Sequence, residues 1–285
     1  MNTSINRNII QRNPLISFFL LVFALTWPFL IVDALGSRGV FSFRLSIPLL
    51  ILTGYMPTLA ALIVTGMTKG RAGIRALFGK LLIARVGLRW YLFAIFAFGA
   101  LCAAAILLTN LSGVSSVLPL LSSDASSFSN PLGFVLNILL LFVITGIVNG
   151  EELAWRGYAL PKLQEKFSAL NSSLILGVIW TMFHLPLFFT LTGSSQAHES
   201  FLGFLIGTVS LTVLFTWMYN HTRGSVLLAY LLHAGTNTWT RIFSVDNGNA
   251  MEGWILTSLT VLLAVIVLVR EGPEALSRTG ARIQE

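Results

Sequence analysis

Residues 135–158, VLNILLLFVITGIVNGEELAWRGY, contain the feature that decides the fold of this chain. The run from Val135 to Val148 carries no charged side chain, yet Glu151 and Glu152 stand side by side shortly after it. Charge is scarce elsewhere too, since Asp, Glu, Lys and Arg make up 10% of the 285 residues and hydrophobic residues make up 55%. With a mean hydropathy of +0.81, this composition is more apolar than that of a water-soluble domain and predicts an integral membrane protein.

Eight apolar stretches are long enough to be transmembrane helices. A helix crosses the roughly 30 Å of bilayer hydrocarbon with roughly 20 residues. The stretches lie near residues 15–34, 47–68, 90–109, 136–158, 173–191, 201–219, 226–243 and 253–269. We therefore expect an all-α fold, a polytopic bundle of about eight transmembrane helices. No repeat or linker divides the chain, so residues 1–285 are expected to form a single membrane domain.

The basic residues orient the predicted bundle. Short cytoplasmic loops are enriched in Lys and Arg, and with eight spans both termini lie on the same side of the membrane. That side holds all but three of the 18 Lys and Arg residues. We therefore expect a multi-pass protein of the bacterial cell membrane with cytoplasmic N- and C-termini. The formal net charge of +7 then reflects this topology and not a nucleic-acid partner.

Two connecting segments have patterns of their own. Within residues 71–85, apolar residues recur at helical spacing between Arg and Lys side chains. This pattern predicts a helix lying on the inner membrane surface, with a simple cytosolic loop as the alternative. Residues 112–130, which are rich in Ser and poor in charge, are expected to form an external loop.

Polar side chains inside the predicted spans are the candidates for function, because ionisable groups are costly in hydrocarbon. Glu152 and Arg156 are four residues apart and share a helix face in the order that favours pairing. Glu151 points about 100° away from that face. If the fourth helix continues to Tyr158, Glu151 lies roughly 10 Å from the cytoplasmic end of the helix. One carboxylate is thus expected to be neutralised locally, and the other is left for a different contact.

Two further spans carry polar groups. His184 follows WTMF in the fifth stretch, and His233 and Asn237 lie one turn apart in the seventh. Counted from the inner ends of their spans, His184 lies roughly 15 Å deep and His233 roughly 10 Å deep. A lone histidine in a span is commonly a hydrogen-bond partner between helices, but a carboxylate, two imidazoles and an amide at similar depth predict a catalytic or ion-binding site. We expect Glu151, His184, His233 and Asn237 to surround one cytoplasm-facing cavity within the membrane.

These polar residues resemble the motifs of the CPBP intramembrane endopeptidase family, which includes the type II CAAX prenyl endopeptidases and bacterial Abi-type relatives. The three family motifs are EExxxR, aromatic-xxx-His and HxxxN. They stand at Glu151, Glu152 and Arg156, at Trp180 and His184, and at His233 and Asn237. Most members carry Phe where Trp180 stands, a departure in aromatic bulk only. Motif order and spacing agree over residues 135–240, the expected catalytic core, whereas the first three spans match only as generic membrane helices.

The resemblance implies an intramembrane endopeptidase that hydrolyses peptide bonds of a membrane-associated or lipidated substrate. Glu151 is then the general base that removes a proton from water, and His184 positions that water. His233 and Asn237 are implied to donate hydrogen bonds to the oxyanion of the tetrahedral intermediate. The residues implied to hold this geometry are Glu152, Arg156 and Trp180.

The implied mechanism uses no cofactor, and a zinc enzyme is the alternative. One carboxylate and two histidines form a common hydrolytic zinc set, which Glu151, His184 and His233 would supply here. The compact HExxH signature of intramembrane zinc proteases is absent from the sequence. We favour glutamate catalysis without a metal ion.

Other classes of protein were weighed against a glutamate protease. The chain has no GxSG motif, and Asp33, Asp124 and Asp246 are expected in loops, so serine and aspartyl intramembrane mechanisms lack their residues. An ion-coupled transporter and a non-enzymatic membrane scaffold, both using the same polar cluster, stay open. Transporters usually show related halves, and the Glu-Glu-Arg pattern has no counterpart in the first three spans. The expected partners are a peptide or membrane-protein substrate and the lipid bilayer.

Overall fold

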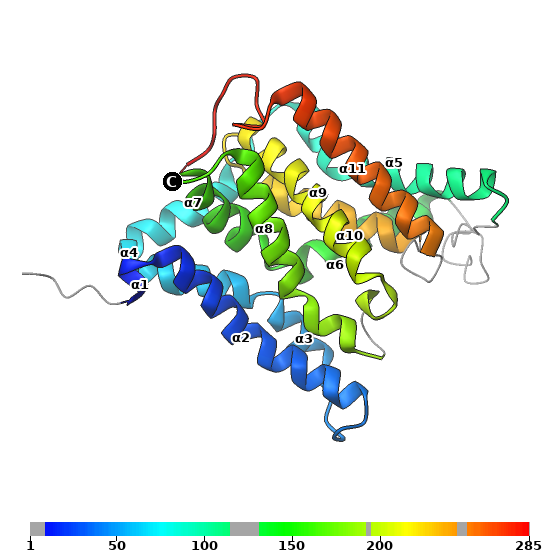
Figure 1. Cartoon of the computed structure of the whole chain (residues 1–285), viewed down its shortest axis with the longest axis horizontal. Coiled ribbons are helices and arrows are strands. Elements are labelled where there is room, and N and C mark those ends of the chain that lie inside the picture. The colour runs from blue at the N-terminus through cyan, green and yellow to red at the C-terminus, as the bar shows by residue number, and fades with distance from the viewer. Residues whose placement is uncertain (1–8, 115–130, 192–194, 244–249, 285) are drawn as a thin grey trace, which may run out of the picture.

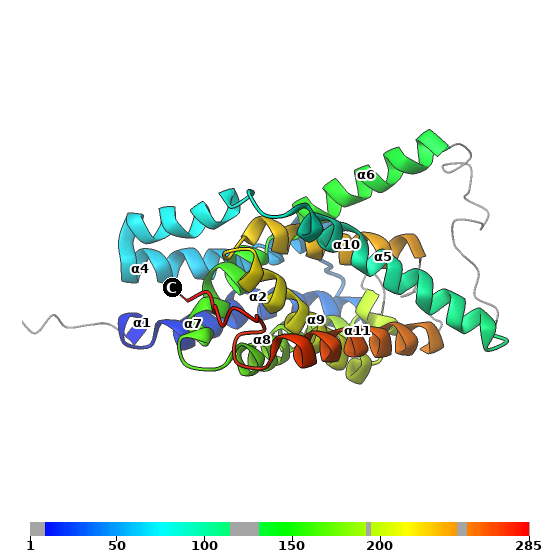
Figure 2. The same cartoon turned by 90° about the horizontal axis from the view of Figure 1, so that it is seen from above.

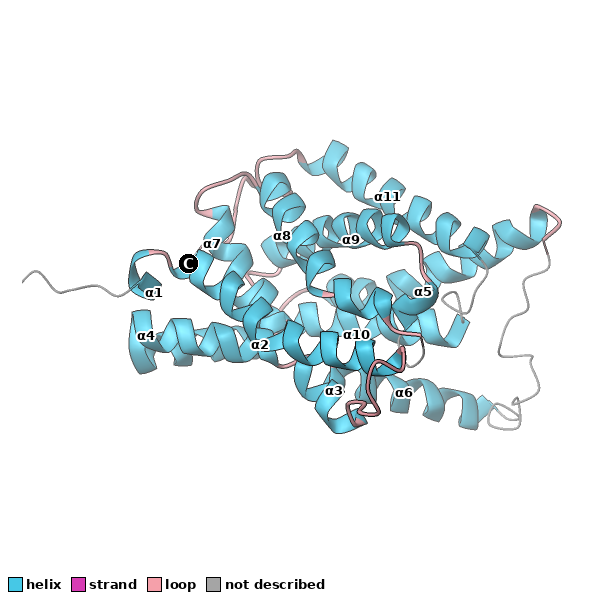
Figure 3. Cartoon of the chain, turned by 60° about the horizontal axis from the view of Figure 1, so that its bottom comes forward, coloured by secondary structure: helices cyan, strands magenta, loops and turns pink. Residues whose placement is uncertain are grey.

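The chain folds as a bundle of helices. The computed structural model describes residues 9–114, 131–191, 195–243 and 250–284, and within these ranges every regular element is helical (Figures 1 and 3). The α-helices are α1 (Ile9–Arg12), α2 (Pro14–Ser37), α3 (Ile47–Thr53), α4 (Met56–Gly79), α5 (Leu88–Leu111), α6 (Pro131–Val148), α7 (Leu160–Gln164), α8 (Ala169–Phe183), α9 (Phe201–His221), α10 (Val226–Phe243) and α11 (Ala250–Glu271). This arrangement confirms the predicted all-α class. Most of the predicted external loop, residues 115–130, lies outside the described residues, as do Asp124 and Asp246.

The described residues contain between five and seven candidate membrane spans. Five are helical segments that are long and apolar enough by themselves, namely α2, α5, residues 169–189, α9 and α11. Two more are bent pairs of helices, α3 with α4 and α6 with residues 153–164. α10 is a helix where the seventh span is expected, but it is not one of these candidates because polar residues such as His233, Asn237 and Arg241 reduce its apolar character. The count of eight spans therefore stays a prediction.

The fourth predicted span is two helical segments, not one. α6 ends at Val148, and the chain continues after a break as a π-helical turn, Leu153–Ala159, followed by α7. The two parts are bent by 56°. The prediction of one helix running from residue 136 to Tyr158 is therefore wrong, and the depth that it gave for Glu151 falls with it. At the break, a Cβ on Gly150 would lie 2.4 Å from the ring of Tyr55, so the backbone can pass this ring closely only because the residue is glycine.

The second predicted span is also bent, and its helix turns back on itself. α3 and α4 meet at an angle of 42°. Within α4, Gly70 has a left-handed φ of 61°, and the two arms of the helix lie side by side (Figure 2). The second arm carries the exposed cations Arg71 and Arg75 and the partly exposed Phe78. The helix expected between residues 71 and 85 is thus present, and its position on a membrane surface stays a prediction.

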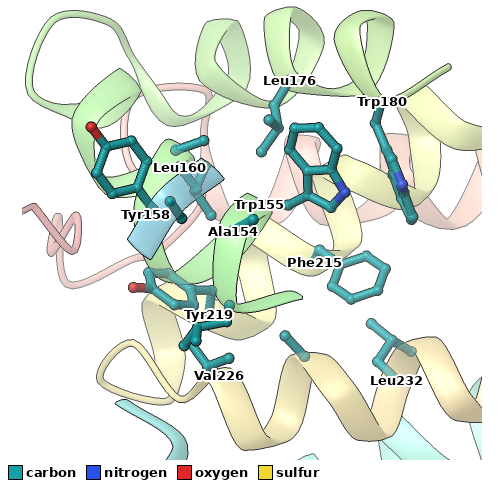
Figure 4. Close-up of a cluster of buried hydrophobic side chains, with 14 of the residues drawn as sticks. Ala154, Trp155, Tyr158, Leu160, Leu176, Trp180, Phe215, Tyr219, Val226 and Leu232 are labelled. Carbon is teal, nitrogen blue, oxygen red and sulfur yellow. The ribbon is translucent and has the colours of Figure 1, made fainter. Parts of the chain in front are cut away.

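The core lies where the π-helical turn meets α8, α9 and α10. The side chains that fill it are almost fully buried and come from these four elements and from α7 (Figure 4). They include Trp155, Tyr158, Leu160, Leu176, Phe215, Tyr219, Val226 and Leu232. Because lipid is as apolar as these residues, the packing of such side chains and the hydrogen bonds between helices hold the bundle together.

The end of the chain covers one end of the bundle. Residues 272–284, here called the C-terminal strap, run over the ends of α7 and α9. Gln164 and Asn220 form a reciprocal amide pair with donor–acceptor distances of 3.1 and 2.8 Å. Asn220 also donates to the Ala275 carbonyl at 2.8 Å, and Gln164 donates to the Ile283 carbonyl at 2.9 Å. α1 and the C-terminus both lie at this end (Figure 1).

α10, which carries His233 and Asn237, is held tightly against α5. Trp239 covers Gly99, and its indole N–H donates to the Ile95 carbonyl at 2.6 Å. On the other side of the crossing, a Cβ on Gly235 would lie 2.5 Å from the carbonyl oxygen of Ala94. A backbone atom cannot move aside alone, so the two helices have room for glycine only.

We predict that Gly235→Ala lowers the free energy of unfolding by about 1–3 kcal/mol, because the added methyl group forces α5 and α10 apart. Gly253→Ala in α11 is the matched control, since no atom lies within 4 Å of the place that its added methyl group would take. Unfolding of both variants in detergent, followed by circular dichroism, measures the difference. Equal stability of the two variants would show that the crossing is not tight.

Candidate active site

The residues singled out in the sequence line one cavity. The cavity has a volume of about 410 Å³ and is bounded by α2, α3, α6, α8, α9 and α10. Glu151, His184, His233 and Asn237 all belong to its lining. These residues come from three separate parts of the chain, so the fold brings together the four side chains that the sequence grouped.

Glu151 is held by two indole groups. It follows the break after α6 and is 7% exposed. Its Oε2 accepts hydrogen bonds from Nε1 of Trp155 and Nε1 of Trp180, each at 2.8 Å. Among the described residues, Oε1 of this carboxylate has no hydrogen-bond partner. Trp155 was not among the site residues predicted from the sequence. Its position four residues after Glu151 is the spacing at which helical side chains meet.

Glu152 makes different contacts and is fully buried. Its Oε1 accepts from Nη1 of Arg156 at 2.7 Å, which is the ion pair expected from the sequence, and from Nδ1 of His233 at 2.7 Å. The contact with His233 was not foreseen, because the sequence placed this histidine beside Glu151. The two adjacent glutamates therefore contact different groups, as predicted, and His233 contacts Glu152 through one ring nitrogen while its side chain lines the cavity.

Arg156 lies between two aromatic rings. Its guanidinium carbon is 4.3 Å from the centre of the Trp180 ring and 3.7 Å from the centre of the Phe215 ring. Among the described residues, its Nε and Nη2 have no hydrogen-bond partner. The buried cation is therefore stabilised by the Glu152 carboxylate and by the faces of the two rings.

Trp180 contacts three polar residues of the site. Its indole N–H donates to Glu151, its ring faces the Arg156 guanidinium, and its ring makes a T-shaped contact with that of His233, with centroids 5.2 Å apart. A phenylalanine at this position has no N–H to donate. The departure from the family motif is thus a gain of one hydrogen bond to Glu151, and the prediction that it concerns bulk only is wrong.

His184 and Asn237 complete the lining. His184 follows the last residue of α8, and its Nδ1 lies 2.9 Å from the carbonyl oxygen of Trp180. Asn237 lies one turn after His233 on α10. Within the described residues, neither Nε2 of His184 nor the side-chain amide of Asn237 has a hydrogen-bond partner. Both groups are therefore available to a molecule in the cavity.

The position of the cavity bears on its predicted orientation. Its lining from α8, α9 and α10 comes from residues 180–184, 204–211 and 233–241, which are the parts of these helices away from the C-terminal strap. α1 and the C-terminus lie at the strap end (Figure 1). The cavity lining and these ends of the chain are therefore at different ends of the bundle, and the side of the membrane that each faces stays a prediction.

The zinc alternative has no preformed ligand cluster among the described residues. In the described ranges, no three His, Cys, Asp or Glu side chains are close enough together to hold a metal ion. Oε2 of Glu151 accepts from two indole groups and Nδ1 of His233 contacts Glu152, so a metal ion would have to use Oε1 of Glu151 and Nε2 of each histidine. Glu151, His184 and His233 thus line one cavity without being arranged as ligands of a common ion.

Asp33 was expected in a loop but lies in α2. It is 3% exposed, and its Oδ1 accepts from Nε of Arg44 at 2.9 Å and from the backbone N–H of Leu45 at 3.0 Å. The hydrogen bond with Asp33 raises the pKa of Arg44, although desolvation acts against it. These contacts fix the connection between α2 and α3, so Asp33 has a structural partner outside the cavity.

Two comparisons with known proteins agree with this site. Residues 131–239 match the model of the Rce1-like type II CAAX prenyl endopeptidases. This match supports the resemblance of residues 131–239 to the CPBP intramembrane endopeptidase family. A similar protein, CAAX prenyl protease 2 from Methanococcus maripaludis, is 29% identical over 154 residues. That alignment covers 52% of this chain and 53% of the relative, so the similarity spans about half of each protein.

We predict that Arg156→Met lowers the free energy of unfolding by about 3–5 kcal/mol, because it leaves the fully buried Glu152 without its permanent counter-charge. The double variant Glu152→Gln/Arg156→Met is expected to be more stable than Arg156→Met alone, since both charges are then gone. Unfolding of Glu152→Gln, Arg156→Met and the double variant in detergent, each compared with the unmodified protein, gives the coupling energy. A single variant as stable as the unmodified protein would contradict the prediction.

Proposed function

We propose that this protein is an intramembrane endopeptidase that hydrolyses peptide bonds of a membrane-associated or lipidated substrate. The observation that carries the proposal is the cavity itself, in which a carboxylate, two imidazoles and an amide face one space inside a helical bundle. Similarity to the Rce1-like endopeptidases supports the same activity, and the relative described above is named a protease.

In the proposed reaction, Glu151 and His184 activate water. The two indole donors on Oε2 fix the orientation of the Glu151 carboxylate and leave Oε1 to take a proton from water. The carbonyl oxygen of Trp180 can only accept, so the proton of neutral His184 is on Nδ1 and its Nε2 is an acceptor. An accepting Nε2 lining the cavity suits a residue that orients a water molecule.

His233 and Asn237 are proposed to stabilise the oxyanion. Because Nδ1 of His233 donates to Glu152, Nε2 can donate to an oxyanion only when the ring is an imidazolium. The Glu152 carboxylate beside it stabilises that positive charge. Because the charges of Glu152 and Arg156 cancel, the positive charge of the His233 imidazolium is available to neutralise the oxyanion. Asn237 can donate from its amide in any protonation state.

The chemical steps balance without a metal ion. The water oxygen attacks the peptide carbonyl carbon as Glu151 accepts the proton, and the tetrahedral oxyanion forms beside His233 and Asn237. When this intermediate collapses, the C–N bond breaks and the proton held by Glu151 passes to the leaving amine. The products are a carboxylic acid and an amine, and Glu151 returns to its starting state.

We predict that Glu151→Gln lowers the rate of cleavage at least about 100-fold, because general bases contribute about 10²- to 10⁴-fold. Glu165→Gln, a change at an exposed glutamate after α7, is the matched control and should cleave normally. Comparing membrane peptides from cells that express either variant identifies the substrate, and a quenched peptide built from that substrate then gives the rate.

Two results would contradict this assignment. The first is cleavage by Glu151→Gln at the rate of the control variant. The second is loss of cleavage after treatment with a zinc chelator and its recovery on adding zinc, which would favour the metal-dependent alternative.

A second prediction concerns Trp180, which we propose as a positioning residue for Glu151. Trp180→Phe retains an aromatic ring beside Arg156 but removes the N–H donor to Oε2. Loss of a hydrogen bond to a charged group, about 1.5 kcal/mol, corresponds to a drop in kcat of about 10-fold with KM nearly unchanged. Trp254→Phe, on the exposed surface of α11, is the control. Equal kcat values for the two variants would remove Trp180 from the proposed machinery.

A further inference from the structure

The cavity is closed toward the strap end of the bundle. Between the cavity and the C-terminal strap lie side chains with almost no exposed surface, from the π-helical turn, α9 and α10 (Figure 4). They are Trp155, Tyr158, Met218, Tyr219, Val226 and Leu232. Behind them, the amide pair of Gln164 and Asn220 binds the strap. A substrate cannot reach Glu151 from this end without displacing the packed core.

The lining of the cavity extends toward the other end. It includes Ile51 of α3 and Leu187, which lies in the 3₁₀ turn after α8. It continues along α10 to Thr240 and Arg241, which lie within three residues of the end of that helix. The Arg241 side chain is exposed, so the lining reaches the surface. The lining also reaches exposed residues of α6, Ile144 and Val148. We take the mouth of the cavity to be at the Arg241 end, away from α1 and the C-terminal strap.

Cationic side chains mark the strap end. The described Lys and Arg residues at that end lie in α1, in and after the second arm of α4, in and after α7, before α10, and at the end of α11 and in the strap. They are Arg12, Lys69, Arg71, Arg75, Lys80, Arg85, Arg89, Lys162, Lys166, Arg223, Arg270, Arg278 and Arg282. Away from the buried Arg156, the described basic residues at the mouth end are Arg38, Arg44 and Arg241. This bias assigns the strap end to the cytoplasm, where Lys and Arg accumulate and anionic lipids attract them.

We infer that the cavity opens on the side of the membrane opposite the cytoplasm. Resting on the proposed endopeptidase function, the inference names the substrate class as an exported or membrane-anchored polypeptide whose scissile bond lies on the external side. A lipidated tail in the cytoplasm would meet the closed end. The inference keeps the predicted cytoplasmic termini and replaces the predicted cytoplasm-facing cavity.

The inference is tested by labelling single cysteines in the full-length protein with a charged, membrane-impermeant maleimide. Cys102, which is buried, is first replaced by alanine. Cysteines are then introduced one at a time at Thr240 in the cavity lining, at the exposed Val40 between α2 and α3, and at the exposed Ala281 in the strap. In right-side-out vesicles, Thr240→Cys and Val40→Cys should be labelled at least about 10-fold faster than Ala281→Cys, and in inverted vesicles the order should reverse.

Each other pattern overturns a named part of the inference. Labelling of Thr240→Cys and Ala281→Cys from the same side shows that the mouth is not opposite the strap. Labelling of Ala281→Cys in right-side-out vesicles, with Val40→Cys protected, reverses the orientation. A Thr240→Cys that reacts only in detergent shows that the mouth is not open to water. None of these results requires cleavage, so they are separate from a failure of Glu151→Gln to lose activity.

Discussion

A buried carboxylate is the constraint on which the rest of the structure depends. Glu152 has no exposed surface, and leaving such a charge without partners costs several kcal/mol. Its partners, Arg156 and His233, come from the π-helical turn and from α10, and Arg156 is in turn enclosed by Trp180 of α8 and Phe215 of α9. One charge therefore requires four helical segments to meet at a defined point, and the apolar side chains of the core fill the space around it.

This constraint also explains how two neighbouring glutamates can differ in role. Because consecutive residues on a helix point about 100° apart, fixing Glu152 in the core turns Glu151 toward the cavity. The break after α6 allows this turn to sit beside α8, where the two indole donors reach Glu151. A π-helical turn is rare, and such turns are frequent at functional sites. The proposed chemistry at Glu151 thus depends on an ion pair that does not touch the substrate.

Much of this arrangement could be predicted from local spacing. The pairing of Glu152 with Arg156 follows from four residues of separation, and hydropathy located α2, α5, α9 and α11. The break at Gly150 could not be found in this way. Mean hydropathy depends only on the side chains of a segment, and the segments on both sides of the break are apolar, so the break does not change it. His233 contacts Glu152 and not Glu151 because of how two helical segments are rotated about their axes. The sequence of one segment alone does not determine this rotation. The hydrogen bond from Trp180 to Glu151 depends on the same rotation.

The depth of His184 was misjudged for a related reason. The apolar stretch near 173–191 places His184 in the middle of its span, but α8 begins at Ala169 and ends at Phe183. His184 therefore lies fifteen residues from the strap end of α8, about 22 Å at the rise of an α-helix, which is further than the depth predicted from the sequence. Apolar composition indicates where lipid surrounds a helix, but it does not set where the helix ends. α8 begins after Ser168, whose hydroxyl accepts a hydrogen bond from the backbone N–H of Asn171, and it ends before the turn that contains Pro186. An error of four residues at a helix start therefore changes the predicted depth of a side chain by about 6 Å.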